Sequence, residues 1–187
     1  FTLLFACLWT RAQDDAYINY TVDDGLPSNM VYCTQQDDRG FMWFGSDAGL
    51  SKFDGYEFTN YTLEDHLPDT EILKFFKDSQ NRIWFYTLNG KVGFVRNDSI
   101  FSSKNTSWLK ELDFNGRITG ILEIDKKLYI AAADQFYKIL DGENVQKVDL
   151  KVPHTWSICF CNSQLYVISP KDTYIINLES GLPQINN

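Results

Sequence analysis

The sequence predicts an all-β fold built from repeated four-stranded antiparallel sheets, and three observations support this. Residues 40–55 recur, as a partial copy, in residues 81–98. Short runs of β-branched and aromatic residues alternate with turn residues along the chain. No segment has the length and apolar periodicity of a convincing helix. A repeat of about 40–50 residues is typical of the blades of a β-propeller. We therefore predict about four blades of an incomplete β-propeller.

The repeat is clearest in the first half of the chain. Residues 17–53 align without a gap on residues 58–94, with 11 identities in 37 positions. This alignment places Trp43 on Trp84 and Phe53 on Phe94, an offset of 41 residues. An internal duplication is therefore expected for the first two blades.

Composition allows a substantial core and excludes two classes of partner. The chain has 187 residues, of which 44% are hydrophobic and 16% aromatic. Its formal net charge is −8, and its 17 Lys and Arg residues form no run or stripe. Nucleic acids and anionic membrane surfaces need clustered cations. We therefore expect neither as a partner.

The chain begins with an apolar run, residues 1–9, that is too short to span a bilayer. We interpret residues 1–13 as the remnant of a secretory signal, with cleavage near Ala12 or Gln13, and residues 14–187 as part of a longer exported protein. A buried first strand, or a lipoprotein box ending at Cys7, are the alternatives. Once Cys7 is removed an odd number of cysteines remains, and these are expected to be buried free thiols: Cys33, Cys159 and Cys161.

The predicted elements of the first repeat follow in order. Strands are expected at 17–22, 30–36, 41–45, 50–53 and 56–61, with turns between them. Gly40 supplies the positive φ that the tight 37–40 hairpin needs, and Asn81 takes this place in the second copy. Ser46–Gly49 forms the next hairpin, and Asp54-Gly55 is a two-residue hairpin signal.

The later copies match in pattern more than in identity. Strand-like runs lie at 128–131, 136–139, 156–161, 165–168 and 173–177. Residues 103–112 are expected to be a loop or a single helical turn inserted between blades. The predicted blades are residues 24–61, 65–102, 116–149 and 153–187.

Residues 37–50 resemble a known repeat. They match the pattern D-x-x-G-x-[LIM]-W-[IF]-G-T-x-x-G-L except for Ser46 in place of Thr, and D-G-L-P-S-N precedes them. The second copy departs further, with Asn81 for Gly40, Tyr86 for Gly45 and Lys91 for Leu50. The sequence thus resembles the two-component-regulator propeller repeats of Bacteroidetes periplasmic sensor proteins, closely over residues 17–101 and in architecture beyond.

The resemblance implies a place and partners. In that family the propellers are often seven-bladed and in tandem, and precede an immunoglobulin-like module, a transmembrane helix and a cytoplasmic histidine kinase. We therefore expect a periplasmic sensor domain, anchored to the inner membrane in the full-length protein, whose partners are its remaining blades and the kinase. A small-molecule or glycan ligand and a homodimer of the full-length protein are also expected.

The motif residues have structural roles as their first interpretation. Trp43 and Trp84 are expected to pack between blades rather than to stack on a ligand. Asp37 and Asp78 are expected to accept hydrogen bonds in Asx turns rather than to bind metal.

The sequence offers no nucleophile beside a base, because His66 and His154 both lie in turns. No catalytic residue, metal site or cofactor is expected. The alternatives are a secreted propeller enzyme acting on a polysaccharide or a lactone, with its catalytic groups in later blades, and a protein-interaction scaffold.

A ligand would be expected at the propeller face formed by the loops leading into each blade and the hairpins between second and third strands. The candidate binding residues there are Asn29, Asp47, Asp69, Asn89 and His154. Turn formation explains each of them equally well.

The repeat also makes a prediction about ring closure. Residues 17–21 align with 58–62, the end of the outermost strand of blade 1, so the chain starts with the outer strand of a blade whose inner strands lie elsewhere. Residues 181–183 fit the outer strand of the fourth blade itself, which leaves no vacancy there. We therefore predict an open arc in which residues 17–22 have no partner strand.

Overall fold

The computed structural model describes residues 17–112, 114, 116–133, 135–141, 143–149, 152, 154–162, 164–177 and 183–185. Within them lie 16 strands, grouped into four antiparallel sheets of four strands. In each sheet the strands pair in chain order, which is the meander of a propeller blade. The predicted all-β propeller fold is confirmed. No helix among these residues has the length and apolar character needed to cross a membrane.

Each sheet is called a blade here. Blade 1 consists of β1 (Val31–Gln36), β2 (Met42–Ser46), β3 (Gly49–Phe53) and β4 (Phe58–Tyr61). Blade 2 consists of β5 (Ile72–Lys77), β6 (Ile83–Thr87), β7 (Val92–Arg96) and β8 (Ser99–Ser102). Blade 3 consists of β9 (Ile118–Ile124), β10 (Lys127–Ala132), β11 (Phe136–Leu140) and β12 (Asn144–Lys147). Blade 4 consists of β13 (Ser157–Cys161), β14 (Gln164–Ile168), β15 (Thr173–Ile176) and β16 (Pro183–Ile185).

Three short 3-10 helices connect these strands. η1 (Val22–Asp24) precedes blade 1 and η2 (Leu63–Asp65) joins blade 1 to blade 2. η3 (Trp108–Glu111) lies between blades 2 and 3, where a loop or single turn was predicted.

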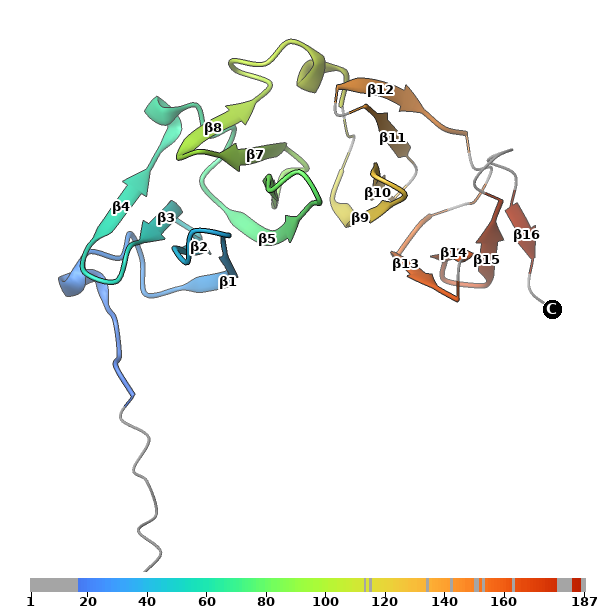
Figure 1. The fold of residues 1–187 in the computed structure, drawn as a ribbon. Coiled ribbons are helices and arrows are strands. Elements are labelled where there is room, and N and C mark those ends of the chain that lie inside the picture. Colours follow the sequence, from blue (N-terminus) through green and yellow to red (C-terminus); the bar gives the residue numbers. More distant parts are fainter. Residues whose placement is uncertain are drawn as a thin grey trace, which may run out of the picture.

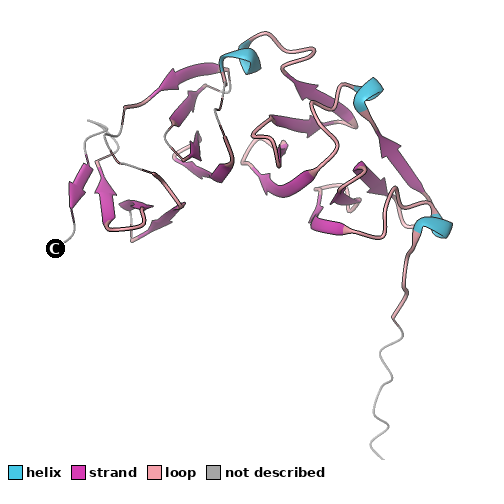
Figure 2. Cartoon of the chain, turned by 180° about the vertical axis from the view of Figure 1, so that it is seen from behind, coloured by secondary structure: helices cyan, strands magenta, loops and turns pink. Residues whose placement is uncertain are grey.

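The four blades stand side by side along an arc (Figures 1 and 2). Blades 1 and 4 form the two ends of this arc, and no described strand of one pairs with the other. The predicted open arc is confirmed.

Apolar side chains fill the three seams between neighbouring blades. Trp43 is 1% exposed and packs with blade 2 residues such as Ile83 and Phe85. Trp84 is 0% exposed and packs with blade 3 residues such as Ile130. A third cluster, which includes Tyr129, joins blades 3 and 4. The predicted role of both tryptophans as inter-blade core is confirmed.

The first hairpin of each repeat is closed by its aspartate. Asp37 Oδ1 accepts hydrogen bonds from the backbone N–H groups of Arg39 and Phe41, and Asp78 Oδ1 does the same two and four residues on. Gly40 and Asn81 both adopt positive φ, 90° and 59°. The Asx-turn and positive-φ predictions are therefore confirmed.

The ungapped alignment of the first two repeats is wrong beyond residue 87. In blade 1 Trp43 pairs with Lys52, whereas in blade 2 Trp84 pairs with Phe94. The β6–β7 hairpin is thus one residue longer than the β2–β3 hairpin, and Val95, not Phe94, corresponds to Phe53. In the corrected alignment Val92, not Lys91, corresponds to Leu50, because Leu50 pairs with Gly45 and Val92 pairs with Tyr86. The second copy therefore keeps an apolar residue where the repeat pattern has Leu.

The strand predicted at residues 17–22 is not formed. Residues 17–21 have no strand assignment, and Val22 begins η1. The corresponding residues 58–61 form β4 because β3 lies beside them and supplies hydrogen-bond partners. A strand forms only in a sheet, so the same sequence pattern has different outcomes at the two places. The predicted absence of a partner strand is confirmed.

The thiols differ from the prediction. Cys33 is half-buried, but Cys159 and Cys161 are exposed. The β13 residues that alternate with them, such as Ile158, face blade 3. The two cysteines therefore face away from blade 3, on a side that no described residue covers. The signal-peptide prediction for residues 1–13, with Cys7, lies outside the described residues.

Candidate functional site

The seam between blades 1 and 2 is organised by an aspartate and a tryptophan of the repeat. Trp43 Nε1 donates a hydrogen bond of 3.2 Å to Asp37 Oδ2. In blade 2 the same bond, from Trp84 Nε1 to Asp78 Oδ2, is 2.8 Å long. The carboxylate therefore closes its own hairpin with one oxygen and orients the indole with the other.

An arginine completes each of these groups in a different way. In blade 2 Arg82 Nε lies 2.6 Å from Asp78 Oδ2, and the side chains of both residues are almost fully buried. Its guanidinium also lies over the rings of Trp84 and Phe94, at 5.1 and 5.3 Å from their centroids. This stacking compensates part of the cost of burying the charge.

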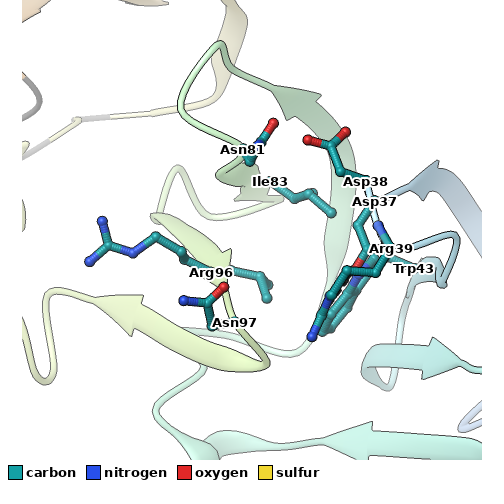
Figure 3. A pocket seen from close by; sticks show the side chains of 9 residues that line it. Asp37, Asp38, Arg39, Trp43, Asn81, Ile83, Arg96 and Asn97 are labelled. Atoms are coloured by element: carbon teal, nitrogen blue, oxygen red, sulfur yellow. Dashed lines mark hydrogen bonds and ion pairs between the residues drawn. The ribbon is translucent and has the colours of Figure 1, made fainter.

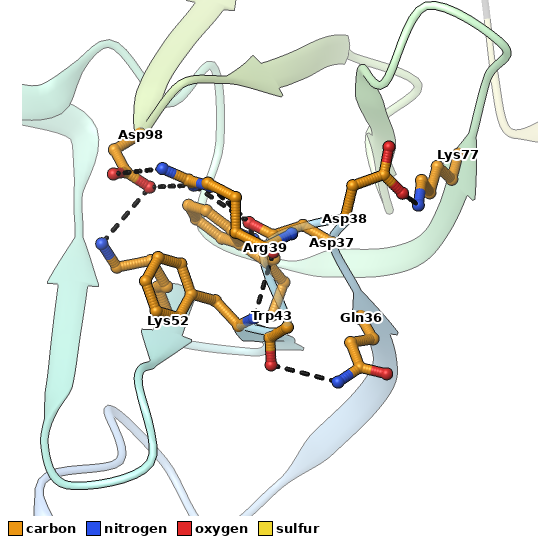
Figure 4. A network of polar contacts seen from close by, with 10 residues as sticks. Gln36, Asp37, Asp38, Arg39, Trp43, Lys52, Lys77 and Asp98 are labelled. Atoms are coloured by element: carbon orange, nitrogen blue, oxygen red, sulfur yellow. Dashed lines mark hydrogen bonds and ion pairs between the residues drawn. The ribbon is translucent and has the colours of Figure 1, made fainter.

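In blade 1 the arginine instead reaches across to blade 2 (Figure 4). Arg39 contacts Asp37 within its own hairpin at 2.9 Å and Asp98, in the β7–β8 hairpin, at 2.6 Å. Lys52 joins from β3, with Nζ 3.3 Å from Asp98. We call these four residues the seam network.

The seam network shifts the titration of its members. The hydrogen bond from Arg39, with help from Lys52, lowers the pKa of Asp98. Burial raises the pKa of Asp37, but hydrogen bonds from Trp43 and Arg39 outweigh it and the net pKa is lowered. Asp98 in turn raises the pKa of Arg39. Asp37, Asp98 and Arg39 therefore carry their charges at neutral pH.

A second contact repeats along the seams with different chemistry. Asp38, at the tip of the β1–β2 hairpin, pairs with Lys77 of β5. Ser79, at the corresponding tip in blade 2, bonds Glu123 of β9 through its backbone N–H at 2.7 Å and its hydroxyl at 2.6 Å. We call these two contacts the seam latches.

A small cavity of about 120 Å³ lies beside the seam network (Figure 3). The hairpins of both blades line it, with Asp37, Asp38, Arg39, Asn81, Arg96 and Asn97 among its residues. These hairpins lie at the opposite ends of the strands from the β2–β3 and β6–β7 hairpins, where ligand residues were predicted. The cavity therefore belongs to the other face of the arc.

Two of the five predicted binding residues come together. Asn89 Nδ2 donates a hydrogen bond of 2.6 Å to Asp69 Oδ2, although the residues are 20 apart in sequence. The other oxygen of Asp69 accepts from the backbone of Thr70. A carboxylate and an amide are thus fixed side by side, between the loop leading into blade 2 and its β6–β7 hairpin.

The other three predicted residues lie apart from this pair in the described hydrogen bonding. Asn29 is exposed, and its Oδ1 accepts from the backbone of Val22 at 3.0 Å. His154 is exposed in a positive-φ turn. Asp47 is half-buried, and its Oδ1 is buried without a hydrogen-bond partner among the described residues.

Neither histidine has the surroundings of a catalytic base within the described part of the chain, where the imidazoles make no hydrogen bond. His66 ends η2 with φ 69°, in the place of Gly25, which ends η1 with φ 107°. Its role there is conformational. The described residues also contain no group of three or more His, Cys, Asp or Glu side chains that could hold a metal.

Sequence reasoning missed the seam network. Arg39, Lys52 and Asp98 lie on two blades, and each taken alone has the pattern of an ordinary turn or edge charge. The available signal was the repeat itself, because it brings corresponding hairpins of neighbouring blades to the same end of adjacent sheets.

Comparison with known proteins agrees with these features. The family described as "Two component regulator propeller" matches residues 25–48, the stretch that runs from the turn after η1 to the β2–β3 hairpin. No curated protein matches the chain at a significant level.

Solved structures share the fold. The extracellular domain of the putative hybrid two component system BT3049 from B. thetaiotaomicron superimposes with a TM-score of 0.71 at 18% identity, over 91% of this chain and 26% of that one. The extracellular domain of the putative one component system BT4673 from the same organism superimposes with a TM-score of 0.62 at 21% identity, over 83% of this chain and 21% of that one. A catalytically inactive virginiamycin B lyase from Staphylococcus aureus, with quinupristin, superimposes with a TM-score of 0.61 at 17% identity, over 86% of this chain and 56% of that one.

This chain spans about a quarter of the length of the two Bacteroides domains. Its Asp-to-Trp hairpin motif in blade 1 coincides with the family match, and its four meander sheets coincide with the structural match. Residues 25–48 thus match the family described as "Two component regulator propeller", and the chain shares a β-propeller fold with the extracellular domain of a putative hybrid two component system from B. thetaiotaomicron.

Proposed function

We propose that these blades are part of an extracytoplasmic ligand-sensing propeller of a two-component sensor. The observation that carries the proposal is blade 1, in which the family match covers the hairpin closed by Asp37 and Trp43. In the full-length protein the propeller would lie on the periplasmic side, anchored to the inner membrane, and would control a cytoplasmic histidine kinase. A homodimer of that protein is part of the proposal.

The proposed ligand is a small molecule rich in hydroxyl groups, such as an oligosaccharide. Asp69 and Asn89 together offer acceptors and an amide donor, which suit the hydroxyls of a sugar. Asp47, in the β2–β3 hairpin, lies at the same end of the strands as this pair, and its side chain is half-buried. These features support the face predicted from the sequence.

The seams provide a physical route for the signal. Neighbouring blades share apolar cores, and the seam network and latches cross between them. Blades joined in this way resist sliding, since close-packed interiors transmit strain. Ligand binding at one face would therefore move the arc as a body toward the membrane-anchored part of the protein.

The test uses the full-length protein in proteoliposomes. Autophosphorylation from labelled ATP is measured with a panel of defined di- to hexasaccharides outside the vesicles, for wild type, Asp69→Ala/Asn89→Ala, and Glu57→Ala. Glu57 lies exposed in the β3–β4 hairpin, away from the pair, and serves as the matched control. At least one saccharide should change the autophosphorylation rate of wild type and Glu57→Ala. The double variant should need at least about a tenfold higher concentration of that saccharide for the same change in rate. A rate that no saccharide changes would overturn the proposed sensor.

The second candidate function is a secreted propeller enzyme, since virginiamycin B lyase shares the fold. The same preparation is assayed for turnover of each saccharide by mass spectrometry. Unchanged saccharides are expected. Cleaved saccharides would favour the secreted-enzyme alternative, with its catalytic groups in other blades.

A further inference from the structure

The connection between blades 2 and 3 is longer than the connection between blades 1 and 2. Residues 103–117 lead from β8 to β9, whereas the shorter stretch 62–71 leads from β4 to β5. We call residues 103–117 the insertion. It contains η3, which lies beside β12 at the outer edge of the arc (Figure 1). The insertion therefore passes from the outer edge of blade 2 to the first strand of blade 3.

Buried side chains anchor the insertion in the seam between these two blades. Leu109 is 1% exposed and Phe114 is 5% exposed, and both belong to the apolar core of this seam. On the blade 2 side, the ring of Trp108 stacks on that of Phe94 at 6.1 Å. On the blade 3 side, the ring of Phe114 lies 4.9 Å from that of Tyr137. The packing of the seam thus determines where the insertion lies.

The insertion meets the β6–β7 hairpin at two glycines. Gly90 of the hairpin has φ 72°, and Gly116 of the insertion has φ 140°. A Cβ atom on Gly90 would overlap the carbonyl oxygen of Gly116 and would lie 3.7 Å from the Cβ of Phe114. Only a residue without a side chain allows two backbones to approach so closely. The hairpin therefore rests directly on the insertion.

On its other side the same hairpin carries one of the proposed ligand residues. Asn89, next to Gly90, donates its 2.6 Å hydrogen bond to Asp69. The backbone N–H of Leu88 donates to the carbonyl of Glu71 at 3.2 Å, in the loop that leads into blade 2. The hairpin is thus held between this loop and the insertion.

Blade 1 lacks both the pair and this support. Its β2–β3 hairpin is one residue shorter, and Ser28 stands where blade 2 has Asp69. No side-chain hydrogen bond between described residues joins Ser28 to that hairpin. A Cβ atom on Gly49 of the hairpin would lie 2.7 Å from the carbonyl oxygen of Tyr61, which belongs to the same blade. Only blade 2 of these two therefore combines a fixed carboxylate–amide pair with a hairpin that rests on an insertion.

We propose that the insertion positions the Asp69–Asn89 pair through Gly90, so that packing in the seam between blades 2 and 3 and saccharide binding at the pair depend on each other. This inference rests on the proposed function. Leu109 and Gly90 act as positioning residues, the first by anchoring the insertion and the second by contacting it. Without this support the hairpin moves and the Asn89 amide leaves Asp69. By reciprocity, a saccharide bound to both side chains stabilises the packing of the insertion.

Four variants of the full-length protein in proteoliposomes test this coupling. Leu109→Ala opens a cavity beneath the insertion, and Leu165→Ala makes the same deletion at a 0% exposed leucine in the seam between blades 3 and 4. Gly90→Ala combines positive-φ strain with the overlap on Gly116. Gly55→Ala, in the β3–β4 hairpin at φ 103°, has the strain alone, because nothing lies within 4 Å of its Cβ. Thermal melts first define a temperature at which every variant is folded.

Two measurements follow, and the first needs no ligand. Hydrogen–deuterium exchange of the Leu88 amide should be at least about tenfold faster in Leu109→Ala and Gly90→Ala than in wild type, because the hairpin opens more often. The saccharide concentration for a half-maximal change in autophosphorylation should rise at least about fivefold in the same two variants. Leu165→Ala and Gly55→Ala should match wild type in both measurements.

Equal effects of Leu109→Ala and Leu165→Ala would overturn the inference, since a general loss of stability would then be the cause. Faster exchange at Leu88 with a wild-type saccharide requirement would overturn it as well, because the insertion would then support the hairpin without acting on binding. A wild-type protein that responds to no saccharide would instead show that the proposed sensor fails. The exchange comparison then decides by itself whether the insertion positions the pair.

Discussion

The indole Nε1 of Trp84 donates a 2.8 Å hydrogen bond to Asp78, an aspartate that is 4% exposed and also holds the buried Arg82. One carboxylate therefore closes the hairpin, orients the indole and neutralises a cation. Asp78→Ala would remove this buried carboxylate from a buried guanidinium, a buried indole N–H and two backbone N–H groups, and we expect a loss of about 3–5 kcal/mol in the free energy of unfolding.

The corresponding Asp37→Ala should cost less, about 1–2 kcal/mol, because the Arg39 side chain is 43% exposed and keeps its contact with Asp98. Urea denaturation of both variants measures the difference. Equal losses would show that the burial of the arginine has no energetic weight.

Trp43→Ala and Trp84→Ala should each destabilise the full-length propeller by about 3–5 kcal/mol, since each leaves a cavity in a seam. Tyr56→Ala, at a side chain that is 95% exposed, should change stability by less than about 0.5 kcal/mol. Wild-type denaturation midpoints together with lost saccharide binding would instead place the tryptophans in the ligand site.

The Arg39–Asp98 contact predicts a pH dependence. The pKa of Asp98 is lowered in the folded protein. The ionised Asp98 therefore contributes stability above the ordinary aspartate pKa of about 4, and this contribution is lost as the pH falls through the folded-state pKa. Asp98→Asn keeps a residue type that tolerates the φ of 61° found there. It should cost about 0.5–1 kcal/mol at pH 7, a value discounted for exposure.

Thermal melts of wild type and Asp98→Asn between pH 7 and pH 3 check this prediction. The difference between the two should shrink below about pH 4 and in high salt. A constant difference across the range would mean that the charge of Asp98 is not the cause.

The two histidines offer a test that separates backbone role from chemistry. Both have positive φ, so His66→Gly/His154→Gly should fold with unchanged or slightly higher stability, as Gly25 already does at the corresponding turn. Saccharide-dependent autophosphorylation should persist. Loss of any saccharide turnover in this well-folded variant would identify an enzyme.

Burial raises the pKa of the Cys33 thiol to about 12. At pH 8 its thiolate fraction should be roughly a thousandfold below that of a solvent-exposed thiol with a pKa of 9.0, and alkylation by iodoacetamide should slow accordingly. Peptide mass spectrometry of native and urea-unfolded protein gives the comparison. Equal labelling of Cys33 in both states would contradict its burial.

Local chemistry was largely readable from the sequence. The positive φ of Gly40 and Asn81, the Asx turns of Asp37 and Asp78 and the burial of both tryptophans follow from short motifs whose physics is local or repeats with the blade. Asp69 and Asn89 were named as site candidates, but their direct hydrogen bond depends on how a loop and a hairpin meet in space.

Other features depend on the neighbouring strands and blades and could not be predicted from the local sequence. An ungapped alignment does not reveal the extra residue in the β6–β7 hairpin, because Gly90 and Phe94 still match Gly49 and Phe53 by residue type. Cys159 has the strand pattern of a buried residue, but its exposure is decided by whether another blade covers that side. Residues 17–20 lack a strand for the same reason.

The seam latches make the blades non-interchangeable. The Asp38–Lys77 latch joins opposite charges, whereas Ser79 is a neutral donor that meets the carboxylate of Glu123. If blade 1 were copied into the place of blade 2, its Asp38 would face Glu123 and two like charges would meet. Pairs of complementary side chains at the seams therefore specify which blade follows which. An array built from one repeated blade would lack these specific pairs, and the order of its blades would not be specified.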